Sequence, residues 1–335
     1  MGPAGREIEA VAELKMQEFV QPSLFGEFDL SSRSRKTVDL REWSPSKRNQ
    51  LEQCPRKYYY QYYGNAADVL NGHSAPLKFY RKLSNSWMLA GILLHLKIRE
   101  VFGIWRKDGT VDTRPFLKEI AQRWQRVKET SVQFARRGNY SEPPTGVLLS
   151  EFVFGQAFAQ QIWSEAGQRL ERALLGFLTL PELERFRQGG LVYDAAIEQS
   201  VRVNGSGFRM RGKIDLAWRE EGRVTVADWK SGDRDGADSD LQLLAYALGV
   251  QHYFGCELEE LDLFRVELGS GKPIPLSVNE REAARARARM AQDTQLMIDL
   301  HKYGAQGSIE AFTPTGSPRI CSLCPYQRIC PGSEA

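Results

Sequence analysis

The sequence has no long apolar run and no strong excess of charge of one sign. No stretch reaches the ~18 consecutive apolar residues of a membrane-spanning helix, which excludes a spanning segment. Residues 1–20 have acids and bases in every apolar run and so lack a signal-peptide core, and we expect a cytoplasmic protein with no membrane contact. Because 45 Lys and Arg residues nearly balance 42 Asp and Glu residues, net charge alone does not indicate nucleic-acid binding.

Cysteine is also scarce. The chain has five cysteines, an odd number, and three of them lie within the last fifteen residues, so a disulfide framework is not expected. With 42% apolar and 26% charged residues, the composition is typical of a folded globular protein and excludes wholesale disorder. The length of 335 residues indicates one large domain or two of ordinary size.

Changes in residue type divide the chain into five parts. They are a flexible, Gly- and Ser-rich arm at 1–43, a helical part at 44–110, a helical insertion at 111–190, a core at 191–310 and a cysteine-rich end at 311–335. In the second part, Pro55 should kink or restart a helix at 47–63, and apolar spacing predicts another helix at 85–105.

The fourth part alternates apolar and polar residues and is rich in β-branched side chains, which predicts strands. The expected strands are 196–203, 208–219, 224–229 and 261–268, and the expected helices are 239–253 and 279–303. Helices followed by a strand cluster and more helices indicate an α/β core with a helical insertion.

Two carboxylates and a lysine lie in two adjacent predicted strands. Asp215 ends the sequence G-K-I-D, and Asp228 and Lys230 belong to D-W-K after an apolar strand. If the strands form a hairpin the carboxylates can converge, and the period of two places Lys230 on the face of Asp228. Such oxygen ligands hold Mg²⁺ or Mn²⁺, and a lysine stabilises charge at an attacked phosphorus. A solvated strand end with an ion pair is the alternative.

Four short motifs follow one another along the chain. They are G-I-L-L-H at 91–95, G-K-I-D at 212–215, D-W-K at 228–230 and Q-L-L-A-Y at 242–246. In this order they resemble the G-x-x-x-H helix, G-x-x-D strand, D-x-K strand and Q-x-x-x-Y helix of the RecB-like branch of the PD-(D/E)XK nucleases. Ile214 precedes Asp215, so the P-D pair in the family name is not matched.

The resemblance implies both a fold and a set of roles. The fold would be a restriction-endonuclease-like α/β core, a mixed central sheet flanked by helices, with 191–310 as the nuclease core. The implied catalytic residues are Asp215, Asp228 and Lys230, and the implied metal ligands are His95, Asp215, Asp228 and the Trp229 backbone carbonyl, with Glu198 a weaker candidate. Gln242 and Tyr246 would hold the DNA strand or brace the site. An imidazole ligand would favour Mn²⁺ over Mg²⁺.

The C-terminal cysteines have the spacing C-x2-C-x5-C. Cys321, Cys324 and Cys330 are one thiol short of an all-thiolate site, and Cys54 is the candidate fourth ligand. Such a set accepts Zn²⁺ or a [4Fe–4S] cluster, and four free thiols are the third alternative. One cysteine before the core and three after it resemble the iron–sulfur members of the branch: AddB-type nuclease domains, the CRISPR adaptation nuclease and exonuclease V. The resemblance implies a [4Fe–4S] staple of the terminal regions, with Cys256 outside it.

Basic and aromatic residues alternate just after the first of these cysteines. Arg56, Lys57 and Tyr59 belong to this stretch, and positive charge with exposed aromatic faces is typical of a single-strand channel. Tyrosines that pack around the cysteines are the alternative. A basic stretch at 123–137 also occurs, for which an ordinary solvated helix face is the preferred interpretation.

A peptide in the predicted arm looks like the bacterial sliding-clamp-binding sequence Q-L-x-L-F. Gln21, Leu24 and Phe25 match it, with Pro22 in place of the usual leucine. Exposed apolar residues in a polar arm could dock into an apolar groove of a clamp protein, or the arm could pack on its own domain.

Together the patterns predict a divalent-metal-dependent DNA nuclease. The resemblance indicates a single-strand exonuclease in DNA repair or recombination, CRISPR adaptation or phage defence, acting on single-stranded or end-bearing DNA. No G-x-x-x-x-G-K-[ST] motif occurs, so a helicase partner would be a separate chain, and a CRISPR integrase is another candidate partner. The alternatives are a catalytically idle, DNA-end-binding Fe–S subunit of a larger nuclease–helicase complex and an RNA nuclease.

Overall fold

The computed structural model of the chain describes residues 40–64, 77–107, 111–138, 140, 146–188, 195–231 and 236–331. The chain divides into two units, residues 1–38 and residues 39–335. The first unit lies outside the described residues, and so does the predicted clamp-binding peptide with Gln21, Leu24 and Phe25. All elements below belong to the second unit.

A mixed six-stranded sheet forms the centre of this unit, in the order β1-β5-β6-β7-β8 with β4 also paired to β5. Its strands are β1 (Glu42–Trp43), β4 (Ala195–Gly205), β5 (Phe208–Glu220), β6 (Arg223–Lys230), β7 (Leu261–Glu267) and β8 (Lys272–Leu276). The pairs β4–β5, β5–β6 and β7–β8 are antiparallel, whereas β6–β7 and β1–β5 are parallel. Glu221 and Gly222 join β5 to β6 with φ of 49° and 81°, as a tight hairpin turn requires.

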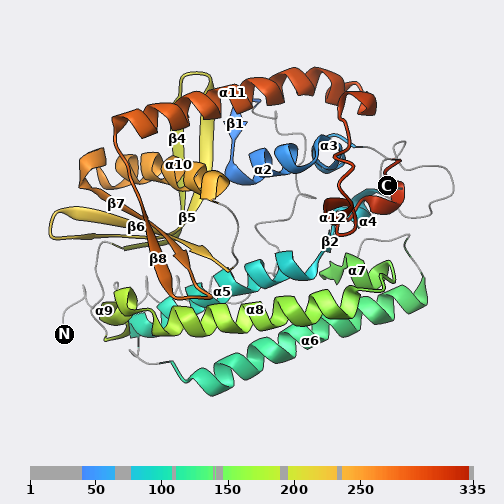
Figure 1. Cartoon of the computed structure of the whole chain (residues 1–335), viewed down its shortest axis with the longest axis horizontal. Coiled ribbons are helices and arrows are strands. Elements are labelled where there is room, and N and C mark those ends of the chain that lie inside the picture. The colour runs from blue at the N-terminus through green and yellow to red at the C-terminus, as the bar shows by residue number, and fades with distance from the viewer. Residues whose placement is uncertain are drawn as a thin grey trace, which may run out of the picture. The chain divides into compact units, whose positions relative to one another are not determined.

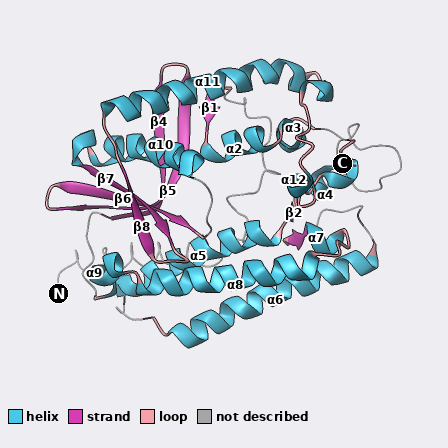
Figure 2. Ribbon diagram, in the orientation of Figure 1, coloured by secondary structure: helices cyan, strands magenta, loops and turns pink. Residues whose placement is uncertain are grey.

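Helices flank the sheet on both sides (Figure 1, Figure 2). The helices are α2 (Pro45–Gln53), α3 (Pro55–Tyr62), α4 (Leu77–Tyr80), α5 (Ser86–Lys107), α6 (Thr113–Arg137), α7 (Ser150–Val153), α8 (Ala159–Thr179), α9 (Glu184–Arg187), α10 (Gly236–Phe254), α11 (Glu280–Ala305) and α12 (Pro318–Cys321). Strands β2 (Leu83–Ser84) and β3 (Leu148–Leu149) form a separate parallel pair. This arrangement confirms the predicted mixed α/β class with a central mixed sheet flanked by helices.

Two helical layers enclose the sheet. On one side, α10 and α11 bury the aliphatic residues of β4 and β5 in the main core. On the other side the contacts are aromatic: Phe177 of α8 meets Trp229 of β6 edge to face at 5.5 Å, and Phe186 of α9 meets Trp218 of β5 at 5.7 Å. The stretch predicted as a helical insertion supplies this second layer through α8 and α9.

The sheet begins earlier than the sequence indicates. The sequence predicts a flexible arm up to residue 43, but residues 42–43 form β1, and Trp43 is fully buried. The indole Nε1 of Trp43 donates to Asp293 Oδ2 of α11 at 3.2 Å. Arg48 of α2 lies 3.2 Å from the same carboxylate, so one buried acid fixes the first strand and the first helix to α11.

Pro55 restarts the helix, as predicted. Cys54 has an extended conformation, with φ of −165°, and it serves both as the C-cap of α2 and as the N-cap of α3. Its sulfur accepts a hydrogen bond from the backbone amide of Lys57. This amide belongs to the first turn of α3, where it has no partner within the helix. The sequence therefore holds this thiol at a fixed point between two helices.

Gly176 sets the distance between α8 and the sheet. A Cβ atom at this position would lie 1.9 Å from the backbone carbonyl oxygen of Leu268, at the end of β7. Because a backbone atom cannot move aside as a side chain can, only glycine allows the helix to approach this closely. Gly103 of α5, in contrast, has open space around its Cα.

We therefore expect Gly176→Ala to lower the free energy of unfolding by about 2–3 kcal/mol, since α8 must move off the sheet. Gly103→Ala should be neutral or raise it by about 0.5–1 kcal/mol, because alanine favours a helix. Chemical denaturation of both variants measures the difference. Equal effects of the two substitutions would contradict the close packing of α8 on β7.

Candidate active site

Five elements place polar side chains at the meeting point of β4, β5 and β6. Asp215 of β5 and Asp228 of β6 are both buried, with 6% and 1% of their surface exposed. The amide of Trp229 donates to Asp215 Oδ2 at 2.8 Å, which joins the middle of β5 to the end of β6. The antiparallel β5–β6 register therefore gathers both predicted carboxylates, as the hairpin hypothesis required.

Lys230, Gln242 and Asp228 form a closed set of contacts. Lys230 Nζ lies 2.6 Å from Asp228 Oδ2 and donates to Gln242 Oε1 at 3.1 Å. The Gln242 amide nitrogen contacts Asp228 Oδ1 at 3.1 Å and the Tyr246 hydroxyl at 3.0 Å. The first turns of α10 thus hold the lysine ammonium beside the carboxylate. Tyr246 itself is buried.

His95, in the middle of α5, faces Asp215. Its Nδ1 lies 3.1 Å from Asp215 Oδ1 and 3.2 Å from Glu198 Oε1 of β4. The other oxygen of Glu198 lies 2.9 Å from Lys213 Nζ of β5. Glu198, the weaker candidate from the sequence, therefore stands as close to the imidazole as Asp215 does.

A local kink in β4 makes this arrangement possible. Glu198 has φ of 50°, in the left-handed region that costs a residue other than glycine about 1–3 kcal/mol. The pairing of β4 with β5 is interrupted there, between the Ile197↔Leu216 and Gln199↔Ile214 pairs. Ala196 and Val201 lie on either side and both join the same core, although residues an odd number apart in a regular strand face opposite sides.

The electrostatics differ for the two carboxylates. Burial raises the pKa of Asp215, but His95 and Lys230 outweigh burial, so its pKa falls below the ordinary value. Burial raises the pKa of Asp228 to about 6. The positive charge of Lys230 opposes this shift, whereas repulsion from Asp215 adds to it. Burial lowers the pKa of His95, but the two neighbouring carboxylates overcome this and raise it well above the ordinary value. In this arrangement His95 is the imidazolium partner of Asp215.

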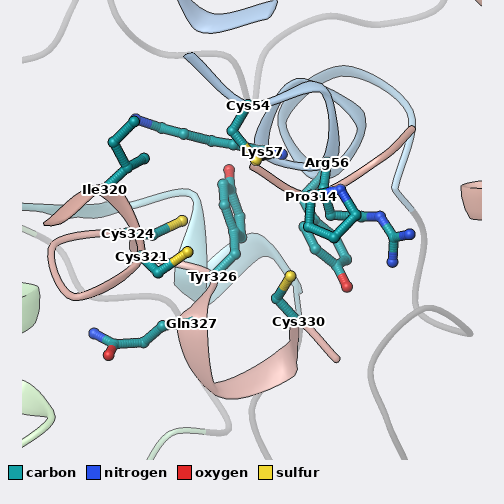
Figure 3. A pocket seen from close by; sticks show the side chains of 11 residues that line it. Cys54, Arg56, Lys57, Pro314, Ile320, Cys321, Cys324, Tyr326, Gln327 and Cys330 are labelled. Carbon is teal, nitrogen blue, oxygen red and sulfur yellow. Dashed lines mark hydrogen bonds between the residues drawn. The ribbon is translucent and has the colours of Figure 1, made fainter. Parts of the chain in front are cut away.

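The four candidate cysteine ligands line one pocket (Figure 3). Cys54 enters it from the α2–α3 junction, and Cys321, Cys324 and Cys330 enter from the C-terminal segment. In the part of the chain that the structure describes, these four cysteines form no disulfide. Burial raises the pKa of Cys324 to about 12, with Lys57 opposing the shift, so a bound cation would favour its thiolate form. Cys256 lies apart from them, buried in the main core.

The basic-aromatic stretch packs around this pocket instead of forming an open channel. Tyr59 is fully buried with Phe312 at 5.0 Å, so the prediction that it stacks on DNA bases is wrong: neither face of its ring is free. Arg56 donates from Nε to the Phe312 carbonyl at 2.7 Å, and both Arg56 and Lys57 line the cysteine pocket. Tyr60 stacks on Tyr326 at 5.2 Å.

The chain matches a known protein family over most of its length. The family model of the PD-(D/E)XK nuclease superfamily matches residues 42–331, and the chain belongs to this superfamily. It is 29% identical over 142 residues to the Gene 69 protein of Mycobacterium phage D29, an alignment that covers 41% of this chain and about half (48%) of the phage protein.

A solved structure, the crystal structure of SSO0001, shares 18% sequence identity with this chain. The match covers 74% of this chain and 98% of that one, but its TM-score of 0.27 is too low to support any conclusion. In the part of the chain that the structure describes, no helix is long and apolar enough to cross a membrane.

Nucleases of this superfamily use divalent metals such as Mg²⁺, and the donor set here fits one. The candidate ligand atoms of His95, Glu198 and Asp215 lie within 4.8 Å of one another. In addition, Asp228 Oδ2 is buried and accepts no hydrogen bond of good geometry, although Lys230 is close. Carboxylate oxygens that are buried without a full set of donors suit a hard cation. The role of the Trp229 carbonyl stays a prediction.

The buried carboxylate of Asp228 should cost stability when no metal is bound. Since the pKa of Asp228 is raised in the folded state, the folded protein loses stability as the pH rises from about 4 through about 6. We expect Asp228→Asn to raise the melting temperature at pH 8 in the presence of a chelator, and to give little or no gain at pH 4. Thermal unfolding at both pH values measures this.

Asp299→Asn is the matched control, because Asp299 lies on the exposed side of α11. A melting temperature for Asp228→Asn equal to that of the unchanged protein at pH 8 would argue against a destabilising buried charge at this position.

Proposed function

We propose that this chain is a divalent-metal-dependent DNA nuclease that hydrolyses phosphodiester bonds at the Asp215–Asp228–Lys230 site. The observation that carries the proposal is the burial of two carboxylates beside a lysine that Gln242 holds in place. A purely structural site gains little from such a group, because burying charges costs free energy that their pairing only partly returns.

The residues divide into metal ligands and groups that act on the substrate. Asp215, Asp228, His95 and Glu198 would hold the cation, with the Trp229 carbonyl as a further ligand. A divalent cation at this point supplies Lewis-acid stabilisation of charge on a phosphoryl oxygen. As a metal ligand, His95 must give up its imidazolium proton, since only the neutral ring offers a lone pair.

Lys230 provides the charge that faces the substrate. Its side chain is 22% exposed, so it would reach a phosphate while staying beside Asp228. Gln242 fixes its direction by accepting a hydrogen bond, and the Tyr246 hydroxyl in turn fixes Gln242. Lys230 would stabilise negative charge that develops on the attacked phosphate, with little reorganisation because it is already in position.

The finer assignment rests on the resemblance of the ordered motifs to the RecB-like branch. We propose an exonuclease that acts on single-stranded or end-bearing DNA, in repair or recombination, CRISPR adaptation or phage defence. A helicase, a CRISPR integrase or a sliding clamp would be its protein partner. The catalytically idle DNA-end-binding subunit and the RNA nuclease are outcomes that the experiment below distinguishes.

We further propose that the cysteine pocket holds a [4Fe–4S] cluster. A tetrahedral zinc site would place four sulfurs about 3.8 Å apart, since each Zn–S bond is about 2.3 Å. Among the described residues, the ligand atoms of His95, Glu198 and Asp215 lie within 4.8 Å of one another. No three of the cysteine sulfurs that the structure describes come as close together as this. Thiols spread more widely than one ion allows leave room for a polynuclear centre.

Lys230→Met should lower the rate of single-strand DNA degradation with Mn²⁺ or Mg²⁺ by about 10³-fold, because a preorganised positive charge is lost. The control is Lys302→Met on the exposed side of α11, which should degrade DNA at the rate of the unchanged protein. Radiolabelled single-stranded DNA and RNA of the same sequence provide the assay. Binding of DNA without cleavage by the unchanged protein would indicate the idle subunit, and equal cleavage of RNA would remove the specificity for DNA.

Anaerobically purified protein should absorb near ~400 nm, as thiolate-ligated iron does. Cys324→Ser should lose this band, whereas Cys256→Ser should keep it, because Cys256 lies outside the pocket. A colourless protein with one zinc ion per chain would overturn the cluster assignment.

A further inference from the structure

The outer half of the β4–β5 hairpin carries a row of basic residues on one face. On β5, Met210 and Gly212 face α10, where the Tyr246 ring covers Gly212. The alternate residues Arg209, Arg211 and Lys213 therefore lie on the opposite face. Arg209 and Arg211 are exposed.

Strand β4 adds to the same face. Its pairing places Arg202 directly opposite Arg211, Ser200 opposite Lys213 and Asn204 opposite Arg209. These three β4 residues are exposed, whereas Val201 between them is buried under α10. We call Arg202, Arg209, Arg211 and Lys213 the basic ladder.

The ladder leads into the candidate active site. Its innermost member, Lys213, lies 2.9 Å from Glu198 Oε2, and Glu198 contacts His95 through its other oxygen. Along β5, the side chains therefore change from basic, at Arg209 and Arg211, to acidic, at Asp215. A strand of phosphates lying along the ladder would reach the carboxylates at its inner end.

The pair at the centre of the ladder has no structural explanation. Like charges directly opposite on neighbouring strands destabilise a sheet. Within the described residues, neither Arg202 nor Arg211 forms an ion pair or a side-chain hydrogen bond that would offset this repulsion.

We infer that the basic ladder binds the phosphate backbone of the single strand whose end enters the active site. This inference rests on the proposed nuclease function and locates the path of its substrate. Alternate residues of one strand are about 6.8 Å apart, which is close to the spacing of successive phosphates in an extended single strand. Arginine suits this role because its planar guanidinium can bind a phosphate with two hydrogen bonds.

Two consequences follow from contacts to phosphates alone. The ladder would give affinity without reading the base sequence, because phosphate contacts carry no sequence information. Its contribution would fall with salt, since each neutralised phosphate releases condensed counterions. It would matter for a long substrate but not for a small phosphodiester that occupies only the active site.

The test compares Arg202→Gln/Arg211→Gln with Arg126→Gln/Arg136→Gln, which removes the same charge from exposed positions of α6. Binding of a fluorescent single-stranded oligonucleotide is measured in chelator over a range of salt, and cleavage is measured with Mn²⁺. The ladder variant should bind at least ~10-fold more weakly at 100 mM salt, and its slope of log K against log salt should be smaller by about 1.4, about 0.7 per lost contact. The α6 variant should match the unchanged protein.

A second substrate separates this inference from the proposed function. Hydrolysis of bis(p-nitrophenyl) phosphate should be the same for the ladder variant and the unchanged protein, because this compound is too small to reach the ladder. If both variants bind DNA with the same affinity and salt slope as the unchanged protein, the ladder is not the strand path, even when cleavage persists. If the unchanged protein cleaves neither substrate with any metal, the proposed nuclease function fails instead.

Discussion

Two buried carboxylates on the neighbouring strands β5 and β6 impose the main constraint on this structure. Neither Asp215 nor Asp228 could stay ionised at low exposure without nearby positive charge. The protein supplies that charge from different elements, with His95 from α5 beside one acid and Lys230 beside the other. Gln242 of α10 contacts Lys230, so the positions of both α5 and α10 against the sheet depend on the electrostatics of this one region.

The kink at Glu198 reconciles two demands on β4. Ala196 in the inner part of the strand and Val201 in the outer part both belong to the main core. A regular strand would leave one of these residues on the wrong face. The left-handed residue between them corrects the alternation and at the same time turns a carboxylate toward His95. Local strain, core packing and the candidate metal site therefore meet at one residue.

Much of the core could be predicted from the sequence because its signals are local. The restart at Pro55 and the alternation of β5 follow from backbone chemistry and residue period, and the ordered motifs indicated which polar groups would converge. What the sequence could not show depends on distant partners. The strand at Trp43 exists because Asp293 lies 250 positions away, and Tyr59 is buried because Phe312 covers it. The φ of Glu198 has no sequence signal, since glutamate rarely adopts it.

The cysteine pocket joins segments from opposite ends of the described chain. The Tyr60 hydroxyl donates to the carbonyl of Ile329 at 2.8 Å, and Asn85 Nδ2, at the start of the helix that carries His95, donates to the carbonyl of Leu323. During synthesis, α3 and the start of α5 leave the ribosome long before these partners exist. The pocket can close only after residue 330 has been translated, so a growing chain lacks it, and a truncated product would expose the tyrosines that it normally covers.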